Sequence, residues 1–261
     1  MEKLVKYVAR VSVYSRRKSE ELIKSGKVRI NNEVVTELSA IVNADSSVTI
    51  GNEIKKEAAK IYIALNKPAG YMSDLMDPRR RKLARDLIKM NMKIFPVGRL
   101  DYHSEGLMIF TNDGEFANMI MHPRYGVEKE YLVKIKGSLK RDEVKQMKDG
   151  IAINGELYKI ENIRFISKAV KRPTNERKSL GGKNIGRKQE MFNAWYSVTI
   201  NEGKNRMIRK IAEAVKHPVM KLKRIRIGRL ELGSLQPGKY RYFEKQEVFG
   251  SSRKKMHCKK I

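Results

Sequence analysis

The amino-acid sequence predicts an α+β fold with two domains. Short apolar and β-branched runs are mixed with a few amphipathic stretches, without the regular strand–helix alternation of a parallel doubly wound sheet. A polar segment without a packing pattern, residues 55–60, separates residues 1–54 from residues 61–249. With 261 residues, the chain is long enough for one large domain and a small one. We expect a small helix-and-hairpin domain, then a domain built on a mixed, largely antiparallel sheet.

The first 54 residues contain signals for one helix and one hairpin. Ser15 is a good N-cap for an amphipathic run that stops at Gly26. Asn31-Asn32 separates two β-rich runs and tolerates the positive φ of a tight turn. The basic side chains of this segment would form either an RNA-contacting surface or an ordinary solvated helix face. They are Arg16, Arg17, Lys18, Lys24, Lys27 and Arg29.

The larger domain is expected to consist mainly of strands. They are predicted at residues 61–67, 106–113, 129–137, 192–200 and 222–235. The alternation in residues 129–137 is typical of an exposed edge strand. Helices are predicted at residues 141–150 and 201–219, the second closed by Pro218. Residues 171–190 are predicted to be a mobile basic loop, and residues 250–261 a disordered tail that attracts RNA.

The charge balance indicates a polyanionic partner. Lysine and arginine total 57 against 29 acidic residues, a formal net charge of +28. Nucleic acid is the first candidate and a membrane surface the second. No run of about 18 apolar residues occurs, and the N-terminus lacks the apolar core of a signal peptide. We therefore expect a soluble, cytoplasmic protein that does not bind a membrane, with a monomer as the default state.

Metal and cofactor signals are absent from the sequence. Cys258 is the only cysteine, and the four histidines are scattered singly, without the spacing of a metal site. Neither a P-loop nor a Gly-x-Gly-x-x-Gly after a strand occurs. We expect no metal, no disulfide and no cofactor.

Asp101 stands where an apolar run gives way to a polar loop. It is either a loop-starting aspartate that binds nearby backbone amides or a catalytic carboxylate. Glu105 and Asp113 are close enough in sequence to suggest a glycosidase-like acid pair. A triad of Asp101, His103 and Ser104 is excluded, because near-adjacent loop residues cannot easily adopt its geometry.

Two resemblances narrow these alternatives. Ser15-Arg16-Arg17, Gly26-Lys27-Val28 and the hairpin from Asn31 to Val35 resemble the S4 RNA-binding domain over about residues 2–54. The resemblance implies a small α/β domain that docks on structured RNA through helix and hairpin side chains. The residues expected to bind RNA here are Arg16, Arg17, Lys18, Lys27 and Arg29.

The second resemblance is to the RsuA/RluB-type pseudouridine synthases. Residues 98–114 contain Gly-Arg-Leu-Asp, Glu-Gly-Leu and Thr-Asn-Asp-Gly in order. Residues 65–70, 129–133 and 202–209 resemble three further motifs of the family. The ordered match extends to about Phe249. Met108-Ile109-Phe110 and Met207-Ile208 depart from the family pattern at apolar positions only.

The resemblance implies a role for each motif residue. Asp101 would act as a nucleophile at C1′ or C6, or as a base that removes a ribose proton. Arg206 would keep it ionised, with Arg99 as a second candidate if its strand extends that far. Tyr131 would stack on the flipped uracil. Lys67 and Leu222 would shape the pocket. Apart from the resemblance, Arg209 and Lys210 are expected to contact phosphates because they are basic side chains of the same segment.

The sequence thus predicts a cofactor-free enzyme that isomerises one uridine in a ribosomal RNA stem-loop. We favour 23S over 16S rRNA because of the basic insert. A non-catalytic RNA-binding or ribosome-assembly factor and an RNA N-glycosidase that releases uracil are the alternatives.

Overall fold

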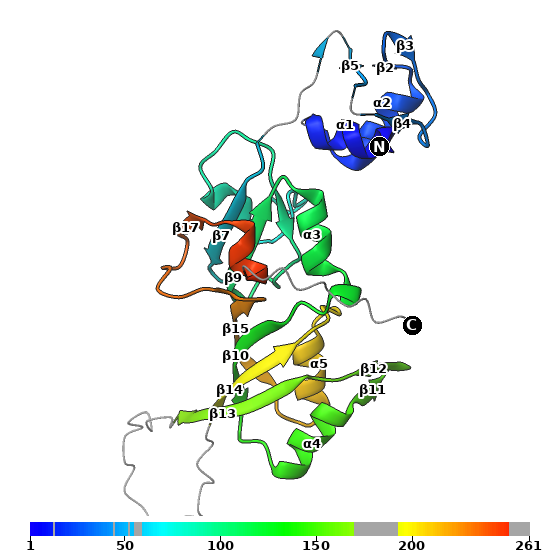
Figure 1. Cartoon of the computed structure of the whole chain (residues 1–261). Coiled ribbons are helices and arrows are strands. Elements are labelled where there is room, and N and C mark those ends of the chain that lie inside the picture. Colours follow the sequence, from blue (N-terminus) through cyan, green and yellow to red (C-terminus); the bar gives the residue numbers. More distant parts are fainter. Residues whose placement is uncertain (13, 44, 52, 55–58, 170–192, 251–261) are drawn as a thin grey trace, which may run out of the picture. The chain divides into compact units, whose positions relative to one another are not determined.

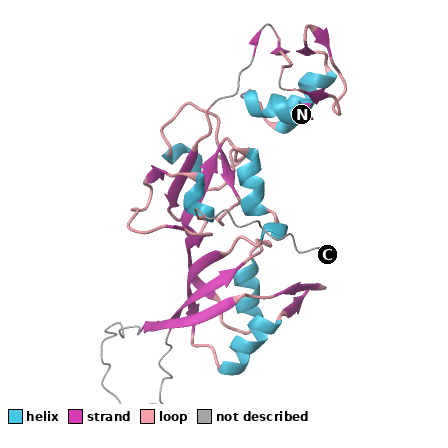
Figure 2. Cartoon of the chain, in the orientation of Figure 1, coloured by secondary structure: helices cyan, strands magenta, loops and turns pink. Residues whose placement is uncertain are grey.

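The computed structural model describes residues 1–250, except residues 13, 44, 52, 55–58 and 170–192. The predicted linker, basic insert and tail therefore lie largely outside the described residues. The chain forms two compact units, one of residues 1–61, 91–94 and 111–114 and one of residues 62–90, 95–110 and 115–261. Helices combine with a large, mostly antiparallel sheet (Figures 1 and 2), so the α+β prediction is confirmed.

The first unit packs two helices against short strands. Its helices are α1 (Leu4–Val11) and α2 (Arg16–Lys24). Its strands are β1 (Glu2–Lys3), β2 (Val28–Ile30), β3 (Glu33–Val34), β4 (Ile41–Val42), β5 (Val48–Ile50) and β6 (Glu53–Ile54). The described strands pair in the order β3-β2-β5-β6, with β1 paired to β4. Leu4 and Val8 of α1, Ile23 of α2 and Val28 of β2 are fully buried in its core.

The local signals of this unit act as predicted. The Ser15 side chain accepts a hydrogen bond from the Lys18 amide (3.2 Å), which caps α2. Gly26 follows the helix with φ +69°. Asn31 and Asn32 have φ values of 49° and 71°, the pair of positive angles that a two-residue hairpin turn requires. Helix α1, with its apolar face on the core, was not predicted.

The second unit is built on one sheet. Its described strands are β7 (Tyr62–Lys67), β8 (Phe95–Val97), β9 (Glu105–Thr111), β10 (Lys129–Lys136), β13 (Asn162–Ala169), β14 (Asn193–Ile200), β15 (Val219–Ile227), β16 (Leu230–Glu231) and β17 (Tyr240–Tyr242). They run in the order β13-β14-β10-β15-β9-β7-β17, with β16 beside β15 and β8 beside β9. Strand β15 pairs antiparallel with β10 and parallel with β9, so it joins the two halves of a mixed sheet.

Helices and a hairpin lie beside this sheet. They are α3 (Gly114–Met121), α4 (Arg141–Asp149), α5 (Met207–Ala214), α6 (Lys245–Phe249), the 3₁₀ helices η1 (Ala84–Leu87) and η2 (Pro123–Tyr125), and the hairpin of β11 (Ile151–Ile153) and β12 (Glu156–Tyr158). Figure 1 shows α4, α5 and this hairpin on the same side of the β13-β14-β10-β15 half. In the described part of the chain, no helix has the length and apolarity needed to cross a membrane.

Two predictions of local structure were wrong. Strand β10 is central, with β14 on one side and β15 on the other, rather than an exposed edge. Its alternation arises because Tyr131, Val133 and Ile135 point into the core, while the residues between them lie on the more exposed face. The helix expected over residues 201–219 is confined to α5, because left-handed backbone precedes it at Arg206 (φ 53°) and follows it at Lys216 (φ 63°).

Candidate active site

Asp101 lies on the loop between β8 and β9, where the sequence predicted the end of a strand. The Ser73 hydroxyl group holds the preceding residue, donating to the Leu100 carbonyl (2.6 Å) and accepting from the Leu100 amide (3.0 Å). The Ser104 amide donates to the Asp101 carbonyl (3.0 Å) and closes a turn. The loop therefore presents the carboxylate from a fixed backbone, with about a third of the side chain exposed (32%).

Lys67, at the end of β7, is hydrogen-bonded to this loop. Its side chain is fully buried, and Nζ donates to the carbonyl oxygens of Pro68 (3.0 Å), Asp101 (3.2 Å) and Ser104 (2.8 Å). Burial lowers the pKa of Lys67 to about 8, although the nearby Asp101 carboxylate opposes the shift. The lysine expected to shape the pocket wall thus ties β7 to both ends of the Asp101–Ser104 turn.

The lowered pKa of Lys67 predicts a pH-dependent stability. Between pH 8 and 10.5 the unfolded chain keeps a proton on Lys67 that the folded chain has lost, so stability rises with pH in this window. Relative to Lys67→Met, the free energy of unfolding of the wild type should increase by about 3 kcal/mol across the window. Urea unfolding at several pH values measures this. The control Lys148→Met, an exposed lysine on α4, should follow the wild type; parallel curves for wild type and Lys67→Met would contradict the prediction.

Two arginines reach the Asp101 carboxylate from the start of α5. Arg209 Nε lies 3.2 Å from Asp101 Oδ2, and Arg206 Nη1 lies 3.6 Å from the same oxygen. Arg209 is the less exposed of the two side chains (15% against 54%). It also donates to the Ser104 hydroxyl group (3.2 Å) and to the Val219 carbonyl (3.3 Å). Arg206 was expected here, whereas Arg209 was expected only at phosphates.

The backbone at Arg206 is in a sparsely populated conformation. Its φ and ψ of 53° and 28° are left-handed, which few residues other than glycine adopt. Arg206 is the residue immediately before α5, so the left-handed turn sets where the helix begins. Arg209 follows one helical turn later. The strained turn therefore lets both arginines converge on one carboxylate, and strain of this kind collects at functional sites.

A cavity of about 370 Å³ opens beside Asp101. Its size is in the range of small-molecule sites. Tyr131 of β10 and Leu222 of β15 line it, and both side chains are buried. Met207 and Ile208 of α5 contribute further apolar surface, and Arg206, the residue before α5, also lines the cavity. The cavity thus combines a flat aromatic ring, an apolar wall and a paired carboxylate.

Comparison with known proteins shows the family of the chain. Residues 61–214 match the model of the RNA pseudouridylate synthase family, and residues 2–48 match that of the S4 domain. The chain belongs to the RNA pseudouridine synthases.

Its relatives cover nearly the whole chain. An uncharacterized RNA pseudouridine synthase of Aquifex aeolicus is 38% identical over 93% of this chain and 90% of its own length. The ribosomal large subunit pseudouridine synthase B of Bacillus subtilis is 36% identical over 95% and 94%. A solved pseudouridylate synthase, 22% identical, shares the fold with a TM-score of 0.60 over 95% of this chain and 98% of that one. The protein is thus an isomerase with an N-terminal S4 domain.

Of the other predicted site residues of the synthase, Arg99 borders the cavity, whereas Lys210 and the S4 residues do not line it. Strand β8 ends at Val97, so strand alternation does not extend to Arg99. Its exposed guanidinium pairs with Asp74 (3.4 Å). Lys210 faces away from the carboxylate and donates to the Tyr158 hydroxyl group (2.9 Å). The predicted RNA-binding residues of the S4 domain are all exposed: Arg16, Arg17, Lys18, Lys27 and Arg29.

Sequence reasoning missed two buried cations that line the cavity of the synthase, Lys129 and Arg224. Lys129 Nζ donates to the Val127 carbonyl (3.0 Å), and burial, with a smaller effect of Arg224, lowers its pKa to about 8. The alternation of side chains along a strand could have indicated both residues. Lys129 is two residues from Tyr131, and Arg224 is two residues from Leu222, so each shares a face with a residue already assigned to the pocket.

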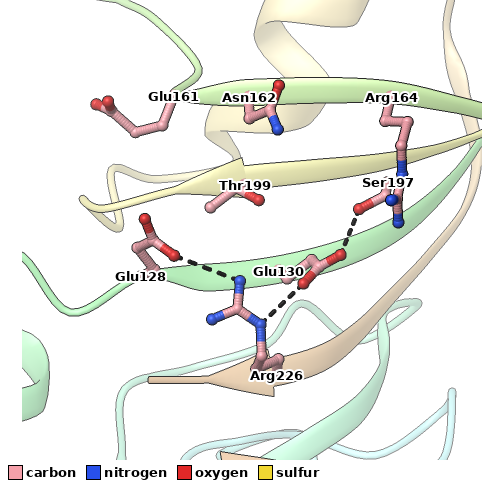
Figure 3. A pocket seen from close by; sticks show the side chains of 8 residues that line it. All are labelled: Glu128, Glu130, Glu161, Asn162, Arg164, Ser197, Thr199 and Arg226. Atoms are coloured by element: carbon pink, nitrogen blue, oxygen red, sulfur yellow. Dashed lines mark hydrogen bonds and ion pairs between the residues drawn. The ribbon is translucent and has the colours of Figure 1, made fainter. Parts of the chain in front are cut away.

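A second cavity, of about 450 Å³, lies on the opposite face of β10 (Figure 3). Its charges are largely satisfied among themselves: Arg226 pairs with Glu130 (2.8 Å) and Glu128 (3.3 Å), and Ser197 donates to Glu130. The hydrogen bond from Ser197, followed by Arg226, lowers the pKa of Glu130. Although larger, this cavity has neither an apolar wall nor an aromatic ring at its lining. The Asp101 cavity is therefore the better candidate site.

Metal ligation has no visible support in the synthase. Among the described residues, no three His, Cys, Asp or Glu side chains gather closely enough to hold a metal ion.

Proposed function

We propose that the protein isomerises a specific uridine of ribosomal RNA to pseudouridine, with Asp101 as the catalytic carboxylate. The observation that supports this most directly is that Asp101, Arg206 and Tyr131 line one cavity, with Arg209 paired to the Asp101 carboxylate. Relatives from Bacillus subtilis and Pseudomonas aeruginosa are named ribosomal large subunit pseudouridine synthase B. We extend that specificity to this chain, so the expected substrate is a stem-loop of 23S rRNA.

The reaction needs a carboxylate but no redox partner. The C1′–N1 bond of uridine breaks, the base turns, and C5 forms a new bond to C1′. C5 then loses its proton and N1 gains one, so the product is an isomer of the substrate. Asp101 can act as a nucleophile at C1′ or C6, or as a base that removes a ribose proton to give a glycal. Both routes fit an ionised carboxylate facing the cavity.

The two arginines hold the Asp101 carboxylate by ion pairs. A carboxylate that substrate covers loses its hydration. Guanidinium groups within 4 Å replace that hydration with fixed positive charge. Arg209 is the principal partner in this proposal because it is more buried and is held by two further acceptors. Arg206, more exposed, is also available to a phosphate.

Tyr131 supplies the base-binding surface. A uridine within a stem is unreachable, so the target must leave the base stack, at a cost of a few kcal/mol. The buried ring of Tyr131 and the apolar side chain of Leu222 offer a planar and an apolar surface to the flipped uracil. Arg99, at the cavity rim, is placed to contact the backbone of the same nucleotide.

RNA binding is assigned to both units. Exposed cations at the start of α2 and on β2 of the S4 domain are suited to phosphate groups. On the catalytic unit Lys210 adds to this basic character. We assign residues 1–54 to RNA docking, residues 61–249 to catalysis, residues 55–60 to a linker and residues 250–261 to a basic tail, in a cytoplasmic monomer.

The proposal is tested by mapping pseudouridines in both ribosomal RNAs from cells that lack the gene. Carbodiimide treatment and primer extension give a stop at each pseudouridine. One stop in 23S rRNA should disappear and return when the wild-type gene is restored.

The other outcomes separate the alternatives. A stop lost from 16S rRNA would correct the subunit and keep the chemistry. Release of free uracil by the purified protein would indicate an N-glycosidase. An unchanged map, together with a defect in subunit assembly that Asp101→Asn rescues as well as wild type, would indicate a non-catalytic assembly factor.

A further inference from the structure

Arg224 is a buried charge that the reaction described above does not use. It lies on β15, between Tyr131 of β10 and Gly106 of β9 in the strand register, and only 3% of its surface is exposed. Its Nε donates to the Leu107 carbonyl (2.7 Å), and its Nη1 lies 3.4 Å from the Tyr131 hydroxyl group. Its Nη2 is buried, with no hydrogen-bond partner among the described residues.

An unpaired buried donor on a charged group is costly. Removing a guanidinium from water without a full set of acceptors destabilises a fold, unless another interaction offsets the loss. No carboxylate forms an ion pair with Arg224 in the described part of the chain, whereas Asp101 has two arginines. The cost is therefore retained in the free protein, and Arg224 borders the same cavity as Asp101 and Tyr131.

Arg224 also differs from the two buried lysines near it, Lys67 and Lys129, in the kind of charge it carries. Burial lowers the pKa of both Lys67 and Lys129 to about 8, and Arg224 contributes to lowering each. A guanidinium keeps its proton at any pH at which the protein is folded. Both lysines have backbone acceptors: three carbonyl groups for Lys67 Nζ and two for Lys129 Nζ. Among the described residues that line the cavity, Arg224 is the buried one that combines a fixed charge with a donor lacking a partner.

We propose that Arg224 binds a carbonyl oxygen of the flipped uracil and stabilises the negative charge that forms on the base when the C1′–N1 bond breaks. This inference rests on the proposed function and assigns the base-binding group of the same site. The electron pair of the broken bond passes to the uracil ring and spreads over N1, O2 and O4. Arg224 Nη2 donates a hydrogen bond to one of the two oxygens, without proton transfer. When C5 bonds to C1′, the ring gives up this charge.

The contact with Tyr131 fits this assignment. The guanidinium lies beside the phenol at the same level of the sheet, with its carbon 6.0 Å from the ring centre. A uracil stacked on Tyr131 would therefore bring its edge near Arg224. Because the charge on the base appears only as the bond breaks, the hydrogen bond strengthens in the transition state. Its loss should lower the rate of the bound complex more than the affinity for RNA.

The test combines enzyme variants with substrates altered at one atom. Synthetic stem-loops carry the mapped target as uridine, 2-thiouridine or 4-thiouridine, because sulfur accepts a hydrogen bond poorly. Single-turnover rates are measured at saturating enzyme for wild type, Arg224→Met and Arg224→Lys. Arg224→Met should lower the uridine rate by about 10- to 100-fold, as expected for a charged hydrogen bond, and Arg224→Lys should recover part of it.

The decisive result is that the effects of Arg224→Met and of the thio substitution at one carbonyl position are not additive. One thio substrate should slow the wild type but slow Arg224→Met no further, because the contact is already absent. The other should slow both enzymes by the same factor. Lys129→Met is the matched control, since it removes a buried cation of the same cavity whose amine has its own acceptor. Both thio effects should persist in full in that variant.

Other outcomes overturn the inference. Equal thio effects in wild type and Arg224→Met would show that Arg224 does not contact the base. Thermal unfolding checks each variant; if Arg224→Met does not fold, Arg224→Lys must show a reduced thio effect at one position. A wild type that forms no pseudouridine in any RNA would reject the proposed function itself, which is a separate result.

Discussion

Asp101→Asn is expected to lower the rate of pseudouridine formation by about 10⁴-fold or more, as loss of a reacting group does in other enzymes. The amide has nearly the same size but can neither attack carbon nor take a proton. Tritium release from RNA labelled at C5 of uridine measures the rate, and filter binding measures affinity. Affinity should stay within about threefold of wild type, because the change removes no phosphate-binding cation.

The control for this result is Asp149→Asn. Asp149 is an exposed acid at the end of α4, so its replacement makes the same change in charge on the same unit, away from the cavity. It should leave activity unchanged. If Asp101→Asn retained more than about a tenth of the wild-type rate, the carboxylate would not be catalytic. A separate loss of folding would show in the thermal unfolding curve.

Gly106→Ala is expected to destabilise the catalytic unit by at least about 3 kcal/mol. Gly106 has a φ of +105°, and a Cβ atom there would lie 2.1 Å from the Arg224 carbonyl oxygen and 2.7 Å from the Arg224 amide nitrogen. Both are backbone atoms of the parallel β9·β15 pair, so no side chain can move aside. Equilibrium urea unfolding measures the effect.

Gly155→Ala separates this clash from backbone strain. Gly155, in the turn of the β11–β12 hairpin, has a positive φ of +79°, but nothing lies within 4 Å of the added Cβ. It should cost only about 1 kcal/mol, the penalty of a left-handed conformation. Equal losses in the two variants would mean that close approach of β9 and β15 is not what requires Gly106.

The parts of the structure that sequence could predict depend on neighbours along the chain. Helix α2 and the β2–β3 hairpin follow from Ser15, Gly26 and the Asn31-Asn32 pair, whose effects extend over three or four residues. The end of α4 at Gly150 has the same local origin. The central place of β10 was missed because an alternating pattern is the same for an edge strand and for a central strand with one covered face.

The motifs predicted which residues belong to the site, but not the contacts that these residues make. Lys67 binds carbonyl groups 34 and 37 residues away, and nothing in its local sequence indicates that contact. Arg206 and Arg209 lie on neighbouring turns, so their sequence spacing cannot tell which guanidinium comes closer to Asp101. The left-handed backbone at Arg206 was equally hidden, because an arginine is not a residue that predicts such a conformation.

The ion network behind β10 bears on mutations far from the cavity. Residues of one strand alternate between faces, so sliding β10 by one position would exchange Tyr131 with the charged side chains behind it. Glu130, held by Ser197 of β14 and Arg226 of β15, pins both neighbouring strands to one alignment. Glu130 thus helps to fix the pairing register of β10. Its loss would affect catalysis by changing the position of the Tyr131 ring in the cavity, even in a variant whose overall stability is nearly unchanged.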